Sequence, residues 1–337
     1  MNPFKKYLMP TFAKRLYFYI RFAVSLAANY YYDFRRYLNF SATADPYRTK
    51  LRHQGRIIAH YHVIEKGLSL KNPKTEFGVD IINNLLLIIK DYQEKYGLDE
   101  VGQVALNVLF SYYQFNLDKA LDNQGLYKQL IEIEEKAKSK EICNIKDGGV
   151  VKVSKEDIKK AANINFRDFV NARYSVRNFD VSEVSLELIK EAISIAIKTP
   201  SVCNRQTWKV YVFDEDNIKR KVLSHQHGNR GFGDTASKIL IITSDLNYFL
   251  GAAERNQCFI DGGLFSMSLI YALHSLGIGT CCLNWSVTYQ TDQALRCEAG
   301  IGDSETIIMM LAVGHLPEQF SVARSSRRKV EEILIVK

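Results

Sequence analysis

Residues 238–244 read KILIITS, a short run that is apolar at both odd and even positions. A strand of this composition must be covered on both faces, so it is expected to be central in its sheet. Two more strands are predicted at 209–213 (KVYVF) and at 307–314 (IIMMLAVG). Helices are predicted around them, one capped by Ser185 and one over 256–276. The C-terminal half is therefore expected to alternate helices and strands.

The N-terminal half has a different pattern. Between residues 46 and 137 apolar side chains recur at spacings of three and four, which predicts an all-helical region. Residues 136–147 are charged and run into two glycines, which predicts a linker. We therefore expect three parts: a basic amphipathic helix over 1–45, a helical extension over 46–147 and a ligand-binding domain over 148–337.

The net charge of +8 is concentrated at the N-terminus. Residues 1–60 hold eleven Lys and Arg and two Asp, a local charge of +9, whereas the other 277 residues hold 34 basic and 35 acidic side chains. The basic residues are interleaved with aromatic ones, as in helices that lie in a membrane interface. Arg21 interrupts the apolar run, so a spanning helix is not expected. Two interpretations stay open for residues 1–40, docking on a protein surface and peripheral membrane contact. A nucleic-acid partner is not expected, because no recognised motif accompanies the charge.

Six cysteines form neither a CxxC pair nor the framework of a small secreted domain, and no cleavable signal peptide precedes them. A reducing compartment follows from this pattern. We expect the chain to be cytoplasmic, and to bind peripherally at the inner face of the membrane if its basic helix contacts lipid.

The first of three candidate ligand-binding clusters is Arg173-Tyr174-Ser175-Val176-Arg177. In an extended segment the side chains of Arg173, Ser175 and Arg177 project to the same side and converge on one anion. A phosphate suits this group, because arginine offers charge-assisted bidentate hydrogen bonds and serine adds a neutral donor. The alternative is an ordinary solvated loop.

The second cluster lies at 199–208, between a predicted helix and a predicted strand, where binding residues often gather. Its Ser201, Asn204 and Gln206 supply neutral donors and acceptors that suit ribityl hydroxyls and amide-like ring edges. The alternative is a polar turn followed by Trp208 in the core.

The third cluster, LGIGTCCLNW at 276–285, is predicted to be a loop after a helix. Its glycines would let the backbone approach a flat ligand, and its N–H groups would donate to a ring nitrogen. A preceding strand and a third glycine are absent, which excludes a dinucleotide-binding fingerprint.

In their order along the chain, the three clusters, the strand that ends at Gly314 and the basic segment Arg327-Arg328-Lys329 resemble the nitroreductase family. The resemblance implies a three-layer α+β fold, in which helices flank a central, mostly antiparallel sheet. It also implies a homodimer with one FMN at each of two sites across the interface. Residues 148–337 would be the FMN-binding domain, and the N-terminal half lies outside the common family pattern.

The resemblance assigns Arg173 and Ser175 to the FMN phosphate and Arg177 to the pyrimidine edge of the flavin. Positive charge at that edge stabilises the anionic reduced flavin. A third arginine would complete the phosphate site, and the candidates are Arg327 and, as alternatives, Arg324 or Arg328.

Other family positions surround the flavin ring. Ser201 and Asn204 would reach the FMN of the other subunit. Thr207 stands where the family usually has proline, which is expected to alter this loop and to leave the fold intact.

Asn229 would lie at the edge of the ring, and Cys282 and Leu283 would pack on it. A backbone N–H near Asn284 or Trp285 would donate to flavin N5, the atom that exchanges hydride. No side chain is expected to be a nucleophile or general base, and no metal site is expected.

A second resemblance concerns HVIEKGLS at 62–69 and the following Phe77-Gly78. These residues resemble a segment of nitroreductase-like proteins associated with polysaccharide biosynthesis. His62 and Glu65, at i and i+3, are compatible with an acid and base pair, with metal ligation and with a structural hydrogen bond.

The function expected from the resemblance is that of an FMN-dependent oxidoreductase. It would transfer hydride from NADH or NADPH through flavin N5 to a small organic acceptor. The alternative is a membrane-surface accessory protein of polysaccharide assembly that keeps the fold with little or no turnover.

Overall fold

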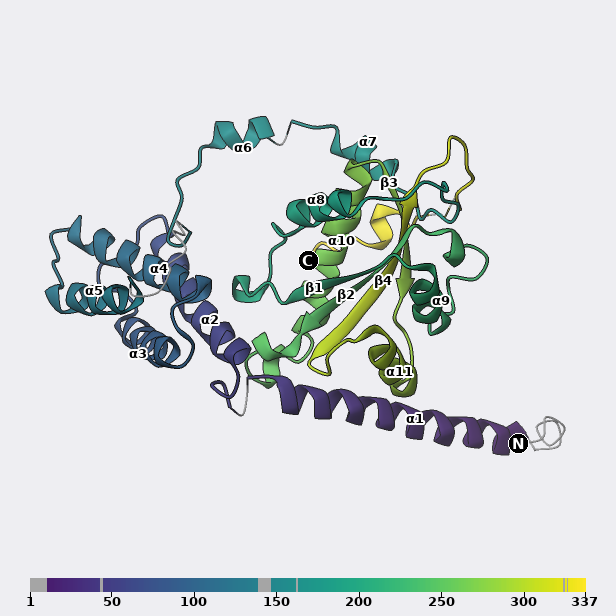
Figure 1. The fold of residues 1–337 in the computed structure, drawn as a ribbon, viewed down its shortest axis with the longest axis horizontal. Helices are drawn as coiled ribbons and strands as arrows, with labels where there is room; N and C mark the ends of the chain where they lie inside the picture. Colours follow the sequence, from purple (N-terminus) through teal and green to yellow (C-terminus); the bar gives the residue numbers. More distant parts are fainter. Residues whose placement is uncertain (1–10, 43–44, 139–146, 162, 324, 326) are drawn as a thin grey trace.

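The computed structural model describes residues 11–42, 45–138, 147–161, 163–323, 325 and 327–337. Figure 1 shows a long N-terminal helix, a helical bundle and a unit of mixed helices and strands. The long helix is α1 (Thr11–Phe40). The bundle holds α2 (Lys50–Leu68), α3 (Val79–Tyr96), α4 (Glu100–Leu117) and α5 (Gln124–Lys138). Two short helices lead from it toward the sheet, α6 (Lys155–Ala161) and α7 (Phe166–Asn171).

The bundle has a hydrophobic core of its own. Leu85 of α3, Leu106 of α4 and Leu130 of α5 are fully buried in it. Thr49 and Asp99 each accept a hydrogen bond from a backbone N–H in the first turn of the helix that follows them, which fixes where α2 and α4 begin. The predicted helical region between 46 and 137 is thereby confirmed over its described residues.

The ring of Phe77 lies directly on Gly67 of α2, so that a Cβ at this glycine would overlap the ring. Tyr112 holds the ring from the other side. Its hydroxyl donates to the Phe77 carbonyl at 2.9 Å, and the two rings meet edge to face at 5.2 Å. Close packing between α2, α4 and the connection after α2 therefore explains this glycine and this phenylalanine.

We expect Gly67→Ala to lower the free energy of unfolding by about 1–3 kcal/mol, because the added methyl must displace a packed ring. Gly125→Ala in α5 is the matched control, since the nearest atom would lie at an ordinary 3.5 Å from its Cβ. Urea denaturation followed by circular dichroism measures both variants. Unchanged stability of Gly67→Ala would contradict the packing explanation.

His62 and Glu65 form a contact within α2, with Nδ1 of the imidazole 3.4 Å from one carboxylate oxygen. The other carboxylate oxygen accepts a hydrogen bond of 3.2 Å from the Gly149 N–H. A Cβ on Gly149 would overlap the Ser111 hydroxyl of α4, so the chain lies close against the bundle there. No cluster of metal-binding side chains is found in the described part of the chain. Glu65 thus makes a structural hydrogen bond with the Gly149 N–H, whereas His62 Nδ1 contacts Glu65 without a hydrogen bond.

The sheet has four antiparallel strands in the order β1-β2-β4-β3. They are β1 (Trp208–Phe213), β2 (Lys238–Asp245), β3 (Ile278–Asn284) and β4 (Glu305–His315). β2 is buried at every position, which confirms the central strand predicted from KILIITS. β1 and β3 form the two edges of this sheet.

Helices cover the sheet on both faces. On one side lie α8 (Leu186–Ala196) and α10 (Gln257–Ser275), and on the other α9 (Asp216–Ser224) and α11 (Tyr289–Ala299). Alternate residues of β2 point to opposite faces of the sheet, and each face has its own hydrophobic core. Leu240 packs on the α10 side and Ile241 on the α9 side. Ser185 caps α8 by accepting a hydrogen bond from the Leu188 N–H. The three-layer α+β fold is confirmed.

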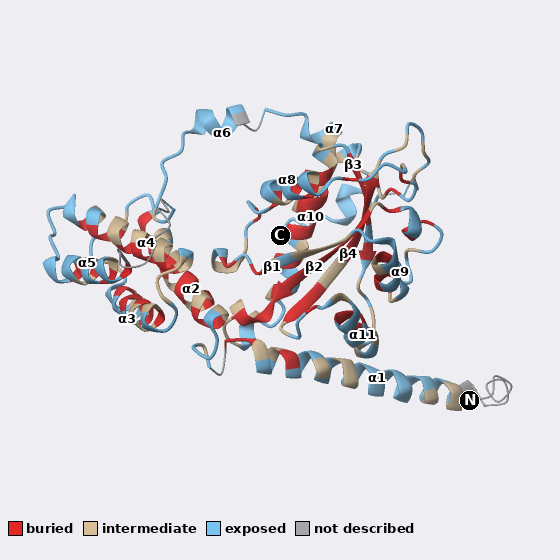
Figure 2. Ribbon diagram, in the orientation of Figure 1, coloured by how far each residue is buried: buried red, intermediate tan, exposed pale blue. Residues whose placement is uncertain are grey.

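α1 is docked on this unit through the second half of its length. Asn29 accepts a hydrogen bond of 2.7 Å from the Tyr289 N–H, and the Tyr32 hydroxyl donates to Asp292 at 2.8 Å. Arg36 donates to two backbone carbonyls near the start of β4. The first half extends beyond the sheet unit and is largely exposed (Figures 1 and 2). Within the ranges described above, no helix is both long and apolar enough to cross a bilayer.

Candidate functional site

Residues 173–177 run beside β3 as a short extended segment. Ser175 forms a parallel bridge with Thr280, and the Val176 N–H donates to the Thr280 carbonyl at 2.9 Å. Val176 is buried in the core, whereas Arg173 and Ser175 are half-buried and Arg177 is exposed. Alternation along the segment therefore places the three polar side chains on the side away from the core.

The guanidinium groups of Arg173 and Arg177 have no carboxylate partner among the residues that the structure describes. Arg177 lies 5.9 Å from the centre of the Phe232 ring, and Arg173 lines a small cavity with Thr280. Burial raises the pKa of the Cys281 thiol on β3, and the nearby charge of Arg177 opposes that rise. Two unneutralised cations on either side of one hydroxyl suit a doubly charged anion such as phosphate.

Residues 278–284 form the strand β3, so the prediction of a loop over 276–285 is wrong for most of its length. Every residue of β3 pairs with β4. Cys282 and Asn284 are exposed, whereas Leu283 is 2% exposed and packs in the core on the α9 side. The face of β3 that a ligand can reach thus carries Cys282 and Asn284 and does not carry the Leu283 side chain.

Two glycines face each other across the edge pair of strands, Gly279 on β3 and Gly314 on β4. A Cβ on Gly279 would lie 2.8 Å from Leu316 and 3.3 Å from the Cβ of Val176, and one on Gly314 would lie 2.7 Å from the Phe179 ring. The space at Gly279 is therefore filled by the chain itself, whereas the sequence suggested that it admits a flat ligand.

A turn after α9 reaches the end of β3. The Gln226 side-chain amide donates to the Asn284 carbonyl at 3.0 Å, and the Asn229 amide donates to the Gln226 carbonyl and, at 2.9 Å, to the Leu223 carbonyl. Asn229 thus holds this turn closed, with its N–H groups already used. One edge of the sheet gathers these predicted residues: Arg173, Ser175, Arg177, Asn229, Cys282 and Asn284.

The loop before β1 has an unusual backbone. Cys203, Asn204 and Gln206 have positive φ values of 51°, 54° and 49°, a conformation that costs energy for residues other than glycine and is often found at functional sites. The Ser201 hydroxyl accepts a hydrogen bond of 3.0 Å from the Gln206 N–H. Asn204 and Gln206 are exposed.

Arg205 anchors this loop, and sequence reasoning missed it. Its side chain is buried, donates to the carbonyls of Val202 and Tyr248, and pairs with Glu254 at 2.7 Å. Its guanidinium also lies 5.5 Å from the centre of the Phe249 ring. No sequence signal marks it, because an arginine in a polar turn is usually solvated.

The two predicted groups do not meet within one copy of the chain. Arg173 and Ser175 lie along β3, whereas Ser201 and Asn204 precede β1, and these strands are opposite edges of the sheet (Figure 1). A ligand that contacts both groups would need two copies.

The C-terminal arginines are exposed. Arg327 donates to the Ser325 carbonyl, and Arg328 pairs with Glu332 at 3.1 Å. Arg324, the third candidate, lies outside the described residues.

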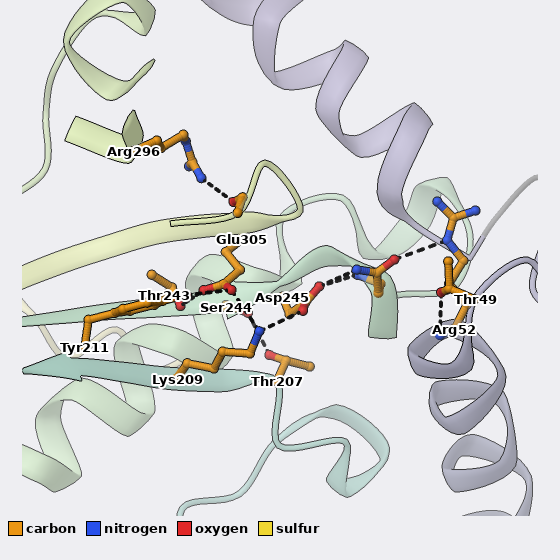
Figure 3. Close-up of polar contacts among 12 residues, drawn as sticks. Thr49, Arg52, Thr207, Lys209, Tyr211, Thr243, Ser244, Asp245, Arg296 and Glu305 are labelled. Carbon is orange, nitrogen blue, oxygen red and sulfur yellow. Dashed lines mark hydrogen bonds and ion pairs between the residues drawn. The ribbon is translucent and has the colours of Figure 1, made fainter. Parts of the chain in front are cut away.

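A polar network that the sequence did not reveal lies at the far end of β4, with buried carboxylates and an exposed lysine (Figure 3). Glu305 accepts hydrogen bonds from Lys209 at 2.8 Å, from Tyr211 at 2.9 Å and from Thr243 at 2.6 Å. Lys209 also pairs with Asp245 at 3.2 Å. Burial, and then the Glu305 carboxylate, raises the pKa of the Tyr211 hydroxyl to about 12. Because Glu305 begins β4, near the opposite end from its pairing with Thr280, we treat this network as part of the scaffold.

The network continues to the helical bundle. Asn247 donates to Asp245 at 2.8 Å and accepts a hydrogen bond of 3.3 Å from Arg52 of α2. These contacts tie the bundle to the end of β2 (Figure 3).

Residues 170–315 match the family model described as "Nitroreductase family". Among curated proteins, the chain is 24% identical over 183 residues to "Putative NAD(P)H nitroreductase YodC" of Bacillus subtilis (strain 168). The aligned region covers 44% of this chain and 89% of that protein. It is 29% identical over 112 residues to the "CLA biosynthesis enone reductase" of Lactiplantibacillus plantarum. The aligned region covers 32% of this chain and 52% of that protein.

Solved structures align with about half of the chain. A putative nitroreductase in complex with FMN from Desulfovibrio desulfuricans is 20% identical, with a TM-score of 0.46 and coverage of 52% of this chain and 98% of the other. A putative NAD(P)H:FMN oxidoreductase from Staphylococcus epidermidis is 22% identical, with a TM-score of 0.45 and coverage of 52% and 97%.

Proposed function

We propose that residues 170–315, which match the nitroreductase family, are the core of an FMN-dependent oxidoreductase whose flavin domain spans 148–337. The proposal rests on one observation above all. Arg173 and Arg177 flank Ser175 on the edge of the sheet, and neither guanidinium is neutralised by a described residue. Because Arg177 is exposed and Arg173 is half-buried, both guanidinium groups are accessible to an anion, and the phosphate of FMN suits two arginines that flank a hydroxyl.

The remaining residues at this edge suit the rest of the cofactor. Cys282 and Asn284 present the reachable face of β3 to the ring, and the strand end near Trp285 offers backbone N–H groups. Leu283 supports the ring position from within the core. When bound, FMN supplies a hydride acceptor and donor at N5, which links NADH or NADPH to a small organic acceptor.

This chain's own side chains would bind and orient the cofactor and exclude water, because no nucleophile or general base is needed when the chemistry belongs to the flavin. The indole N–H of Trp285 donates to Asp292 at 2.8 Å, which fixes the ring just beyond β3. A cavity of about 340 Å³ lies between this tryptophan and α1.

The proposal includes a homodimer. Ser201 and Asn204 lie at the edge opposite to Arg173, so they can contribute to the same cofactor only from a second copy. Phe259, Ile260 and Leu264 expose apolar surface on α10 that a second copy would cover.

An absorbance spectrum of the purified chain, followed by anaerobic addition of NADH and then NADPH, tests the proposal. We expect oxidised-flavin bands that disappear when the preferred nucleotide is added. Protein that shows no flavin bands even after incubation with FMN would contradict the cofactor assignment. Bound FMN that neither nucleotide reduces would contradict the proposed electron donor.

A further inference from the structure

α1 has two distinct sides. The residues that dock it on the sheet unit, Asn29, Tyr32 and Arg36, are spaced by three and four and so lie on one face of the helix. At 3.6 residues per turn, the opposite face carries large apolar side chains in two groups, before and after residues 21–30. We call these residues the outer stripe: Leu16, Ile20, Tyr31, Phe34 and Leu38.

Every side chain of the outer stripe is between 47% and 61% exposed. Figure 2 colours most of α1 as exposed or intermediate. The stripe spans residues 16–38 of a helix of 30 residues, and the exposed Ala23 and Ala27 continue its face between Ile20 and Tyr31. An exposed apolar helix face of this length indicates that something covers it. In this structure the body of the protein contacts only the opposite face, along the second half of α1.

The charges along α1 indicate what covers the stripe. Arg15, Arg21 and Arg35 are exposed along α1 outside the stripe, and the first acidic residue of the helix is Asp33. A second α1 laid against the first would bring these cations together, which costs energy. An anionic surface would be attracted to all of them, and tyrosine is suited to the boundary between headgroups and acyl chains.

We infer that α1 lies in the headgroup region of an anionic lipid bilayer, with the outer stripe toward the acyl chains and the arginines at the phosphates. Charged residues interrupt the apolar sequence of α1, so this helix is not apolar enough to span the bilayer. Because Tyr32 and Arg36 hold it firmly, lipid binding also sets the orientation of the sheet unit at the membrane. This inference does not depend on flavin chemistry.

Co-sedimentation of the full chain with vesicles tests the inference. We expect strong binding to vesicles of phosphatidylglycerol mixed with phosphatidylcholine and weak binding to phosphatidylcholine alone. The double variant Arg15→Gln/Arg21→Gln should bind the anionic vesicles about 30-fold more weakly, because each basic residue near an anionic surface contributes to binding. Lys159→Gln/Lys160→Gln on exposed α6 removes the same charge and should bind like the wild type.

The outer stripe is tested in the same assay. Ile20→Ser/Phe34→Ser should weaken binding by about 30-fold or more, because two apolar side chains no longer leave water. Leu70→Ser/Leu87→Ser removes similarly exposed apolar side chains from the bundle and should have no effect. Circular dichroism reports whether each variant is folded.

Three outcomes would overturn the inference. The first is failure of the wild type to bind anionic vesicles. The second is an equal loss of binding in the α1 variants and their controls. The third is a stripe variant that binds normally and has a lower mass by light scattering than the wild type, because the stripe would then be a contact between copies of this chain.

Discussion

Simultaneous replacement of Arg173 and Arg177 by glutamine is expected to weaken FMN binding by at least about 100-fold. Each guanidinium that meets a phosphate or an anionic ring edge forms charge-assisted hydrogen bonds, worth about 1.5–3 kcal/mol to a charged partner. Two such losses together correspond to about 3–6 kcal/mol, and every 1.4 kcal/mol is about tenfold in affinity. Titration of apoprotein with FMN, followed by flavin fluorescence, measures the change directly.

The fold should survive this change, because neither arginine makes an ion pair with a described residue. Arg167→Gln is the matched control. It is an exposed arginine of α7, six positions before Arg173, and should bind FMN like the wild type. Wild-type affinity in the double variant would place the phosphate elsewhere, and Arg327 would be the next residue to replace.

Arg205→Met is expected to lower the free energy of unfolding by about 2–4 kcal/mol. The methionine would leave the Glu254 carboxylate without its ion-pair partner and the Tyr248 carbonyl without its donor, while the Val202 carbonyl would keep its hydrogen bond from the backbone N–H of residue 205. Loss of one member of a buried pair costs about 3–5 kcal/mol, and we expect somewhat less because Glu254 is 22% exposed. Urea denaturation measures the loss.

Arg255→Met provides the comparison at a site close by. Arg255 is exposed and its guanidinium donates to one carbonyl, at 3.3 Å, so its replacement should change stability by less than about 0.5 kcal/mol. If Arg205→Met were equally harmless, the loop before β1 would not depend on its buried guanidinium. Loss of FMN binding at full stability would instead indicate a direct contact with the cofactor.

Elements with a strong local pattern were predictable from sequence. KILIITS is buried on both faces in the structure, and Ser185 caps α8 as its position indicated. In both cases residues close together in the sequence determine the outcome, through alternation and through a cap in the first helical turn.

β3 was missed because its glycine and two cysteines carry little strand signal. The strand exists because each of its residues finds a partner on β4, and Gly279 lies opposite Gly314. The position of Leu283 follows from the same alternation. Once 278–284 is a strand, Leu283 must point to the core if Cys282 and Asn284 face outward.

The network around Glu305 was beyond the reach of sequence reasoning. Lys209, Asp245 and Glu305 are far apart along the chain and meet because sheet register places Asp245 opposite Glu305, with Lys209 opposite Thr243. Register depends on the whole fold and leaves no local mark. Arg205 was missed for a related reason, since its partners Tyr248 and Glu254 come from a distant segment.

The opposite placement of the two candidate ligand-binding groups has a consequence for assembly. Each copy offers one group along β3 and another before β1, and such unlike surfaces can join copies in two ways. In the proposed assembly a twofold axis or a closed ring matches every group, whereas head-to-tail addition that does not close makes a filament with an unmatched group at each end. Only a closed assembly would therefore hold as many complete sites as copies.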